Sequence, residues 1–342
     1  MSELSYLEKL LDGVEVEWLP LSGLARIRNG KDHKSLSEGE FPVYGSGGIM
    51  RYVDTYAYNK PSVLIPRKGS LGNLFFVNVP FWTVDTIFYT EIDEAQIRPK
   101  YLYYFLTTVG LGEMNQAGGV PSQTQSVLNK LKIPIPCPGN PQKSLAIQSE
   151  IVRILDKFTA LTAELTAELN MRKKQYNYYR DQLLSFDEEQ EKPIYLEKLL
   201  DGVEVEWKTL EDISIKISSG GTPKTGVSEF YDGDIPWLRT QEVNFCDIWD
   251  TEVKITESGV KNSSAKWIPK NCVIVAMYGA TVGKIGINKI PMTTNQACAN
   301  IQLNEEVAHY RYVFHFLCSQ YTYIKSLGTG SQTNINAQIV KN

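Results

Sequence analysis

The stretch that decides the fold is YLEKLLDGVEVEW at residues 6–18, because the same letters return unchanged at residues 195–207. Chance does not produce an identity of this length inside one chain, so the two stretches indicate a duplication. Stacked repeats recur about every 20–50 residues, and these two copies lie much further apart. The sequence therefore predicts two duplicated domains rather than a solenoid.

Weaker similarities follow the two openings in the same order. The matching pairs are 60–65 (KPSVLI) with 270–275 (KNCVIV), 69–72 (GSLG) with 279–283 (GATVG), 101–106 (YLYYFL) with 312–317 (YVFHFL), and 122–124 with 331–333, both SQT. Between these landmarks the copies share little. Duplication without functional divergence predicts more even similarity, so we interpret the copies as one scaffold that carries two different central surfaces.

Each copy has the pattern of a mixed, β-rich domain. Short apolar or β-branched runs bounded by Gly, Pro and Asn are typical of strands, and they occur at 62–65, 74–77, 87–92, 273–278 and 285–287. The runs 101–106 and 312–317 favour amphipathic helices. The predicted fold class is α+β, with two mixed, β-rich domains joined by a long coiled-coil helix.

That helix lies between the copies. Prolines disfavour helix at 133–141, whereas residues 142–186 contain neither Pro nor Gly. Roughly 45 residues at about 1.5 Å each give a helix of about 65 Å. Apolar residues recur along it with the spacing of a coiled-coil seam, which requires a partner helix. The predicted subunit-interface residues are Ile147, Ile151, Ile154, Phe158, Leu161 and Leu165, continued less strictly by Leu169.

Within the helix, TAEL at 162–165 is repeated at once at 166–169. Two interpretations stay open. The repeat is an ordinary stretch of helix, or it adjusts the length of the helix, since four residues add about one turn and keep the seam nearly in phase.

Bulk properties limit the class of protein. The chain has 342 residues, which suits two or three domains, and its net charge of −4 gives no global basic field for nucleic acid. The five cysteines are scattered and never form CxxC, which argues against disulfides or zinc and for a reducing compartment. We find neither a signal peptide nor a membrane span. These features predict a soluble, cytoplasmic protein.

Catalytic and metal-binding patterns were sought without success. A methyltransferase carries a D/N-P-P-Y/F/W box, and the sequence has none. The glycine-rich stretch 44–48 is better explained as a turn. The stretch 279–284 (GATVGK) has three residues between its glycines, whereas a phosphate-binding loop has four and a Ser or Thr after the Lys. The histidines lack metal-like spacing, so we predict neither a catalytic residue nor a metal site.

The helix and the opening resemble a known family. Residues 145–186 (LAIQSEIVRILDKFTALTAELTAELNMRKKQYNYYRDQLLSF) and 5–18 (SYLEKLLDGVEVEW) are similar to the DNA specificity (S) subunit of type I restriction-modification systems, in particular its type IC branch. The resemblance implies a conserved opening at 1–18, a target-recognition domain at 19–141, a spacer helix at 142–187, a linker with the repeated segment at 188–207, and a second target-recognition domain at 208–342.

The resemblance also implies a function and partners. Each target-recognition domain recognises one half of a bipartite site in double-stranded DNA, and the chain catalyses nothing. The spacer binds two modification subunits, which use S-adenosylmethionine to methylate adenine. Restriction subunits, which use ATP and Mg²⁺, complete the complex. This chain itself holds no cofactor.

The second copy differs from the family pattern at its end. By the alignment of the two SQT stretches, residues 340–342 match 131–133, just before the prolines and the helix. The sequence therefore predicts that the distal spacer helix is absent from this chain. A second copy of the chain, or a fragment that bears the distal helix, is then a further expected partner.

Polar and basic side chains on loops are the candidates for DNA contact. Arg and Lys suit guanine, and Asn and Gln suit adenine, in the major groove, while other basic residues bind phosphates. The predicted set is Lys31, His33, Lys34, Arg51, Arg67, Lys68, Asn73 and Gln123 in the first copy, and Ser219, Thr222, Lys224, Arg239, Gln241, Lys284, Asn295 and Gln296 in the second. Any single member could equally be an ordinary solvated side chain.

Two other functions were weighed. The chain could be a non-DNA scaffold with two binding modules on a coiled-coil arm, which a gel shift with modification subunit and DNA would distinguish. It could instead be a fused methyltransferase, which the missing cofactor motifs disfavour and binding of S-adenosylmethionine would support.

Overall fold

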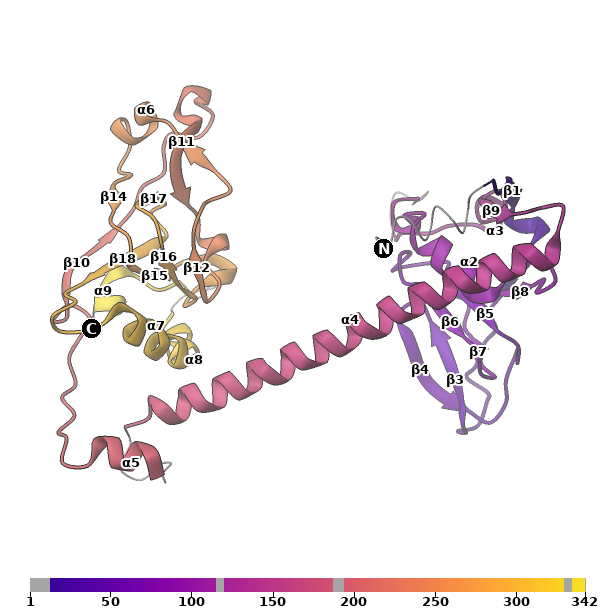
Figure 1. Cartoon of the computed structure of the whole chain (residues 1–342), viewed down its shortest axis with the longest axis horizontal. Coiled ribbons are helices and arrows are strands. Elements are labelled where there is room, and N and C mark those ends of the chain that lie inside the picture. The colour runs from indigo at the N-terminus through magenta and orange to yellow at the C-terminus, as the bar shows by residue number, and fades with distance from the viewer. Residues whose placement is uncertain (1–12, 115–119, 187–193, 329–333, 342) are drawn as a thin grey trace. The chain divides into compact units, whose positions relative to one another are not determined.

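The computed structural model describes residues 13–114, 120–186, 194–328 and 334–341 (Figure 1). The chain divides into two compact units, 1–167 and 168–342. The boundary falls inside helix α4 (Pro141–Leu183), whose 43 residues span about 65 Å at about 1.5 Å each. The predicted fold class, two β-rich domains joined by a long helix, is confirmed. Among the described residues, no helix is long and apolar enough to cross a membrane.

The first domain contains three sheets, with strand orders β1-β9, β2-β8-β5-β6 and β4-β3-β7. The strands are β1 (Val16–Pro20), β2 (Ala25–Asn29), β3 (Phe41–Gly45), β4 (Gly48–Val53), β5 (Ser62–Pro66), β6 (Phe75–Val77), β7 (Trp82–Thr83), β8 (Ile87–Ile92) and β9 (Lys132–Pro136). The helical elements are η1 (Leu21–Gly23), α2 (Pro99–Thr107), η2 (Leu111–Glu113) and α3 (Gln125–Leu128).

The core of the first domain lies between its largest sheet and helix α2. Strand β5 is buried along its whole length, as expected of an interior strand with an apolar sequence. Its Ser62 hydroxyl donates to the Thr90 carbonyl oxygen at 2.8 Å, so this buried polar group is satisfied. Leu102 and Leu106 of α2 face the same core.

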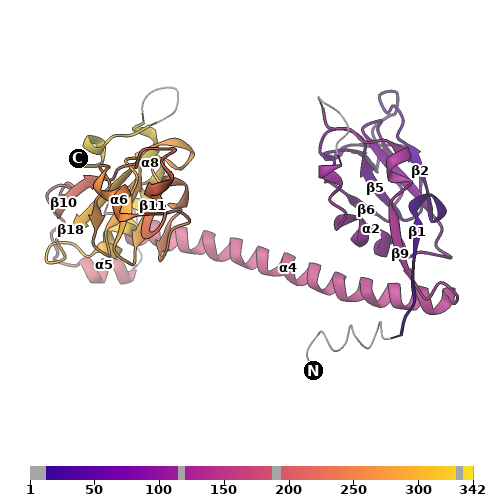
Figure 2. The ribbon, with the colours of Figure 1, turned by 90° about the horizontal axis from the view of Figure 1, so that it is seen from above.

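The start of α4 packs on this domain rather than on a partner helix (Figure 2). Ile147 is 5% exposed and belongs to the domain core, and Ile151 packs against it. The prediction that Ile147 is a subunit-interface residue is therefore wrong. A heptad seam identifies an apolar face but cannot show whether a helix or the chain's own domain covers it.

Polar contacts fix α4 on α2. The Gln148 side-chain oxygen accepts from the backbone N–H of Arg98 at 2.8 Å. Further along, the Asp156 carboxylate accepts from the Tyr104 hydroxyl at 2.6 Å and pairs with Lys100 at 2.8 Å. These bonds hold the first four turns of the spacer helix against the first domain.

The second domain repeats the plan with sheets β10-β18-β15-β16-β12 and β13-β11-β17-β14. Its strands are β10 (Ser214–Ser219), β11 (Tyr231–Leu238), β12 (Cys246–Ile248), β13 (Lys254–Ile255), β14 (Trp267–Ile268), β15 (Val273–Ala276), β16 (Ile285–Asn288), β17 (Met292–Thr294) and β18 (Cys298–Leu303). Its helical elements are α5 (Ile194–Leu200), η3 (Ser228–Phe230), η4 (Thr240–Glu242), α6 (Glu257–Lys261), η5 (Gly279–Thr281), α7 (Tyr310–Ser319), α8 (Tyr321–Ser326) and α9 (Ala337–Lys341).

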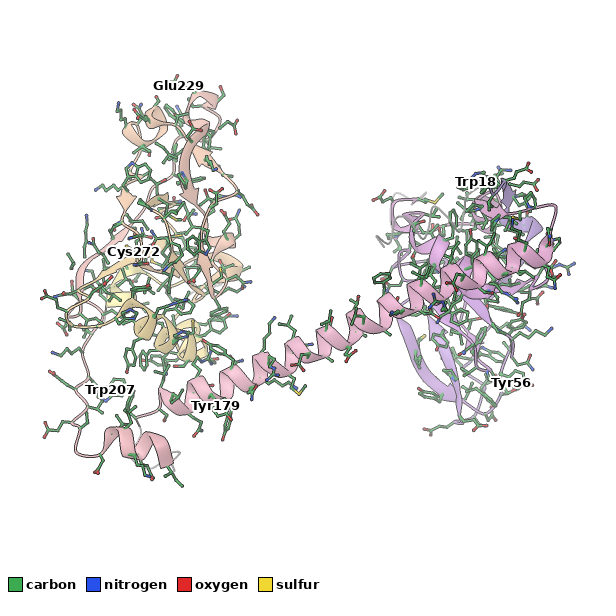
Figure 3. All side chains as sticks on the ribbon, in the orientation of Figure 1. Trp18, Tyr56, Tyr179, Trp207, Glu229 and Cys272 are labelled. Atoms are coloured by element: carbon green, nitrogen blue, oxygen red, sulfur yellow. The ribbon has the colours of Figure 1, made fainter. Side chains whose placement is uncertain are left out.

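The repeated opening places one tryptophan in each domain, and both are labelled in Figure 3. Trp18 meets Phe105 of α2 edge-on at 6.1 Å between ring centroids, and Trp207 meets Phe316 of α7 at 5.9 Å. In the second domain this pair borders an apolar groove of about 860 Å³, which Tyr312 also lines. Of the repeated stretch, residues 6–12 lie outside the described residues.

Backbone hydrogen bonds correct the alignment of the two copies at their ends. Ile335 N–H donates to the Met277 oxygen at 3.0 Å, as Gln123 N–H donates to the Arg67 oxygen at 3.0 Å. Ile335 therefore takes the place of Gln123, and residues 331–333, on which the expected alignment was based, lie outside the described residues. On this register residues 340 and 341 match 128 and 129, so the expected match to 131 and 132 is wrong by three residues.

Candidate nucleic-acid interface

Loops that are distant in sequence meet at one end of the main sheet of the first domain. We call them loop cluster 1, formed by residues 30–36, 45–48, 66–74, 83–86 and 120–124. The hydrogen bonds that join them include Lys31 N–H to Thr83 O at 2.7 Å, Arg67 N–H to Thr86 O at 2.8 Å, Gly69 N–H to Pro121 O at 2.8 Å, and Ser46 N–H to Thr86 Oγ1 at 3.3 Å. The backbone thus holds the loops as one surface.

The second domain builds the same surface from equivalent loops. We call it loop cluster 2, formed by residues 219–227, 238–242, 277–284, 294–297 and 334–336. Its joining bonds are Gly221 N–H to Thr294 O at 2.9 Å, Asn295 N–H to Leu238 O at 2.9 Å, Met277 N–H to Ala297 O at 2.8 Å, and Ile335 N–H to Met277 O at 3.0 Å. Two domains that conserve a loop framework while changing its side chains are suited to bind one class of ligand with different specificity.

Two glycines make the close approach of these loops possible. A Cβ added to Gly30 would lie 1.9 Å from the Val84 oxygen, and one added to Gly220 would lie 1.9 Å from the Thr294 oxygen. Real Cβ atoms do not come that close to other heavy atoms, so both positions require glycine. Sequence reasoning missed this pair, although each glycine directly follows the end of the first strand of its main sheet.

Seven of the eight predicted DNA-binding residues of the first domain lie on loop cluster 1, among them Lys31, Arg67, Lys68 and Asn73. Lys31 and Lys68 are both exposed, and the Lys68 ammonium lies 3.9 Å from the Asp85 carboxylate. Arg67 lies over the Phe88 ring at 5.9 Å, and the Asn73 amide donates to the Ser46 oxygen at 3.4 Å. These four side chains lie on one surface, as contact with DNA requires. The role of each side chain remains a prediction.

Of the other predicted residues of the first domain, Lys34 and His33 lie on the same loop cluster, and Arg51 lies on β4 outside it. Lys34 is exposed on the same loop as Lys31, with its N–H donating to the Asp32 carboxylate at 3.1 Å. Hydrogen bonds of this kind lower the Asp32 pKa, so a negative charge accompanies the basic residues there. His33 is half-buried beside them, and the Arg51 guanidinium donates to the Leu36 oxygen at 3.1 Å.

The prediction that Gln123 contacts DNA is wrong. Its side chain is 2% exposed, and its amide nitrogen donates to the Pro66 oxygen at 2.5 Å. A side chain buried in this way cannot reach a base or a phosphate. It supports the loop that carries Arg67 instead, which polarity alone could not reveal.

The predicted residues of the second domain also gather on its loop cluster. Ser219, Lys224, Gln241 and Gln296 are exposed, and Asn295 is half-buried. The remaining three have protein partners: Thr222 donates its hydroxyl to the Gln296 oxygen, Lys284 donates to Asn244 at 2.9 Å, and Arg239 pairs with Glu252 at 2.8 Å and Glu242 at 3.5 Å. The two ion pairs thus fix the position of the Arg239 guanidinium.

The described residues contain no cluster of His, Cys, Asp and Glu that could hold a metal ion. Burial raises the pKa of the Cys272, Cys298 and Cys318 thiols to about 12, which keeps them protonated. Cys272 lies inside the second domain (Figure 3). Buried neutral thiols act as packing groups and not as nucleophiles.

The spacer helix carries a second kind of candidate surface. Beyond the turns that pack on the first domain, Phe158, Leu161, Leu165 and Leu169 are 48%, 46%, 60% and 53% exposed. Each Leu or Ile that leaves water contributes about 1.5–3 kcal/mol. An exposed row of this kind is suited to bind another helix, and the prediction of a subunit interface here remains a prediction.

Comparisons with known proteins agree on the family. The type I restriction modification DNA specificity domain matches residues 14–172 and 202–342. The chain is 41% identical over 337 residues to the specificity subunit of type I restriction enzyme EcoR124I/EcoR124II of Escherichia coli, covering 94% of this chain and 79% of that protein. It is 43% identical over 222 residues to the EcoprrI specificity subunit of Escherichia coli, covering 56% of this chain and 55% of that protein.

A solved structure shares the fold. The S subunit of a type I restriction-modification system from M. genitalium superposes with a TM-score of 0.64 at 16% identity, covering 97% of this chain and 84% of that one. With both domains and most of the spacer matched, the chain belongs to the family of type I restriction-modification DNA specificity subunits.

Proposed function

We propose that the chain recognises a bipartite DNA site, one half with each domain, and that it binds the modification and restriction subunits without catalysing a reaction. The observation that carries this proposal is the paired loop clusters. The same hydrogen-bonded framework occurs in both domains, yet basic side chains dominate cluster 1 and amides dominate cluster 2. Different side chains on one framework are what two different half-sites require.

The exposed row on α4 supports the partner assignment. We assign it to two modification subunits and to a second copy of the chain or a fragment that bears the distal helix, with restriction subunits completing the complex. S-adenosylmethionine belongs to the modification subunits, and ATP and Mg²⁺ to the restriction subunits. The cytoplasm, where chromosomal DNA is accessible in bacteria, is the proposed location, and the type IC assignment rests on the spacer and the opening.

The test separates DNA recognition from the scaffold alternative. The chain, together with modification subunits, is mixed with a random-sequence DNA pool, and bound DNA is recovered and sequenced. The proposal predicts two defined half-sites at fixed spacing. Recovery of no DNA, or of DNA without a shared sequence, would favour the scaffold.

Charge variants show whether loop cluster 1 is the contact surface. The double variant Lys31→Ala/Lys68→Ala is expected to weaken binding to all sequences alike and to reduce the salt dependence by about one phosphate contact per lysine. Lys60→Ala is the control, because Lys60 is exposed but lies outside the cluster. Equal effects of the two variants would argue that the cluster has no special role.

A further inference from the structure

Asp85 lies at the exposed tip of a turn in loop cluster 1. The turn joins β7 to β8, and the Ile87 N–H closes it by donating to the Val84 oxygen at 3.2 Å. Thr83, Val84 and Ile87 are buried, whereas Asp85 is exposed. The turn therefore presents this one acidic side chain to the solvent on the surface that carries the basic residues.

Neighbouring parts of the domain hold the turn through backbone hydrogen bonds. The Thr83 oxygen accepts from the Lys31 N–H at 2.7 Å. The Val84 N–H donates to the Tyr44 oxygen at 3.0 Å. Because the backbone that leads into Asp85 is fixed in this way, little loop-ordering entropy is lost when its side chain meets a ligand. A fixed, exposed position of this kind is suited to recognise one group of a ligand.

The Asp85 carboxylate keeps its capacity to accept hydrogen bonds. Within the described residues its charged partner is Lys68, at 3.9 Å, which is longer than a hydrogen bond. An exposed pair of this kind contributes about 0–1 kcal/mol, so it gives the carboxylate no strong structural role. Asp32, the other acidic residue of the cluster, instead accepts from the Lys34 N–H at 3.1 Å and so stabilises its own loop.

A carboxylate on a DNA-binding surface has a narrow choice of partners. Phosphates carry the same charge and repel it, so the backbone contacts that suit Lys31 and Lys68 do not suit Asp85. In the major groove guanine presents the acceptors O6 and N7, and thymine presents the acceptor O4. Adenine has a donor at N6 but an acceptor beside it at N7, whereas cytosine presents its N4 donor alone. Cytosine is therefore the base that matches a carboxylate best.

We propose that Asp85 selects a cytosine in the half-site recognised by the first domain, by accepting a hydrogen bond from cytosine N4. The inference rests on the proposed function. The matching backbone bonds make Asn295 the equivalent of Val84, so Gln296 takes the place of Asp85 in the second domain. One framework position thus carries a carboxylate in one domain and a neutral amide in the other. The selection of cytosine by a carboxylate is specific to the first half-site.

The experiment replaces the carboxylate by an amide of the same shape. The full chain with Asp85→Asn is assembled with modification subunits, and methylated sites are sequenced from a randomised pool. An amide suits adenine, because it accepts from N6 and donates to N7. At one position of the first half-site the ratio of cytosine to adenine is expected to fall about ten-fold, equal to about 1.4 kcal/mol. The second half-site is expected to stay unchanged.

Asp32→Asn is the matched control, because it removes the same charge from the same cluster at a carboxylate that its own loop engages. It is expected to leave every base preference unchanged. Asp85→Ala removes the acceptor altogether and is expected to abolish the preference for cytosine without favouring adenine. Thermal unfolding of each variant identifies loss of folding, and Asp85→Ala serves as the test if Asp85→Asn proves unstable.

The outcomes distinguish the two proposals. The first half-site is the one that changes when residues 19–141 are exchanged for those of another family member. A first half-site made only of A·T pairs, base preferences that Asp85→Asn leaves unchanged, or an equal change with Asp32→Asn would overturn the assignment of Asp85. Two half-sites would still be found in those cases. Absence of any sequence-specific methylation by the wild-type complex would overturn the proposed function itself.

Discussion

Substitution of Gly30 by alanine tests whether the loop clusters depend on close backbone contact. The added Cβ would lie 1.9 Å from the Val84 oxygen, more than 1 Å closer than the 3.0 Å limit for real Cβ atoms. The loop after β2 must then move away from Thr83, which breaks the 2.7 Å bond from the Lys31 N–H. Overpacking costs about 1–3 kcal/mol, and the lost hydrogen bond adds about 1 kcal/mol.

We therefore expect Gly30→Ala to destabilise the first domain by about 2–4 kcal/mol. For a domain of this size each kcal/mol lowers the melting temperature by about 2–4 °C. Calorimetry of the full chain is the assay, because two domains can unfold in separate transitions. Gly220→Ala should lower only the transition of the second domain.

Gly139→Ala is the matched control, since nothing lies within 4 Å of its added Cβ and its φ is not in the left-handed region. It should melt within about 1 °C of the wild type. If Gly30→Ala melts like Gly139→Ala, the loops are not held as the structure describes. A shift of both transitions by either glycine variant would contradict the independence of the two domains.

Three other perturbations follow from the spacer helix. Phe158→Lys and Leu165→Lys should each weaken assembly with the partner subunits at least ten-fold, because each removes an apolar contact of about 1.5–3 kcal/mol. Glu164→Lys, at an exposed position, should not weaken assembly. Light scattering of the mixed subunits measures the assembly. A third TAEL inserted after the second lengthens the helix by about 6 Å and should widen the gap between half-sites by one or two base pairs without changing their bases. Sequencing of the methylated sites measures the gap. An unchanged gap would mean that the repeat is an ordinary stretch of helix. Burial and two neighbouring arginines lower the pKa of His315, whose Nδ1 lies 2.7 Å from the Tyr176 hydroxyl. Packing of the end of α4 on the second domain should therefore be complete above pH 6.5 and weaken as the pH falls through and below that value. Hydrogen exchange across 172–183 that does not change with pH would refute this.

Much of the architecture could be predicted because its signals are local. Strand 87–92 has the predicted bounds, and 101–106 lies within helix α2. The identity of 6–18 and 195–207 indicated two domains, and the lack of Pro and Gly over 142–186 indicated one long helix. Each of these features depends on periodicity or composition within a short window.

The errors concern contacts between distant residues. Ile147 matched a coiled-coil seam, but the core of its own domain covers it. Gln123 is polar, but it bonds to the Pro66 oxygen 57 residues away and is buried. Arg239 is basic and was predicted to contact DNA, but Glu252 and Glu242 pair with its guanidinium at 2.8 Å and 3.5 Å.

The central claim is that each domain recognises its own half of one DNA site. The most direct measurement is a genome-wide map of methylated adenines in cells that carry the modification subunits with either the wild-type chain or a chain whose residues 19–141 come from another family member. The account predicts that the exchange replaces one half-site and leaves the other half-site and the gap unchanged. A change in both halves, or in neither, would contradict it.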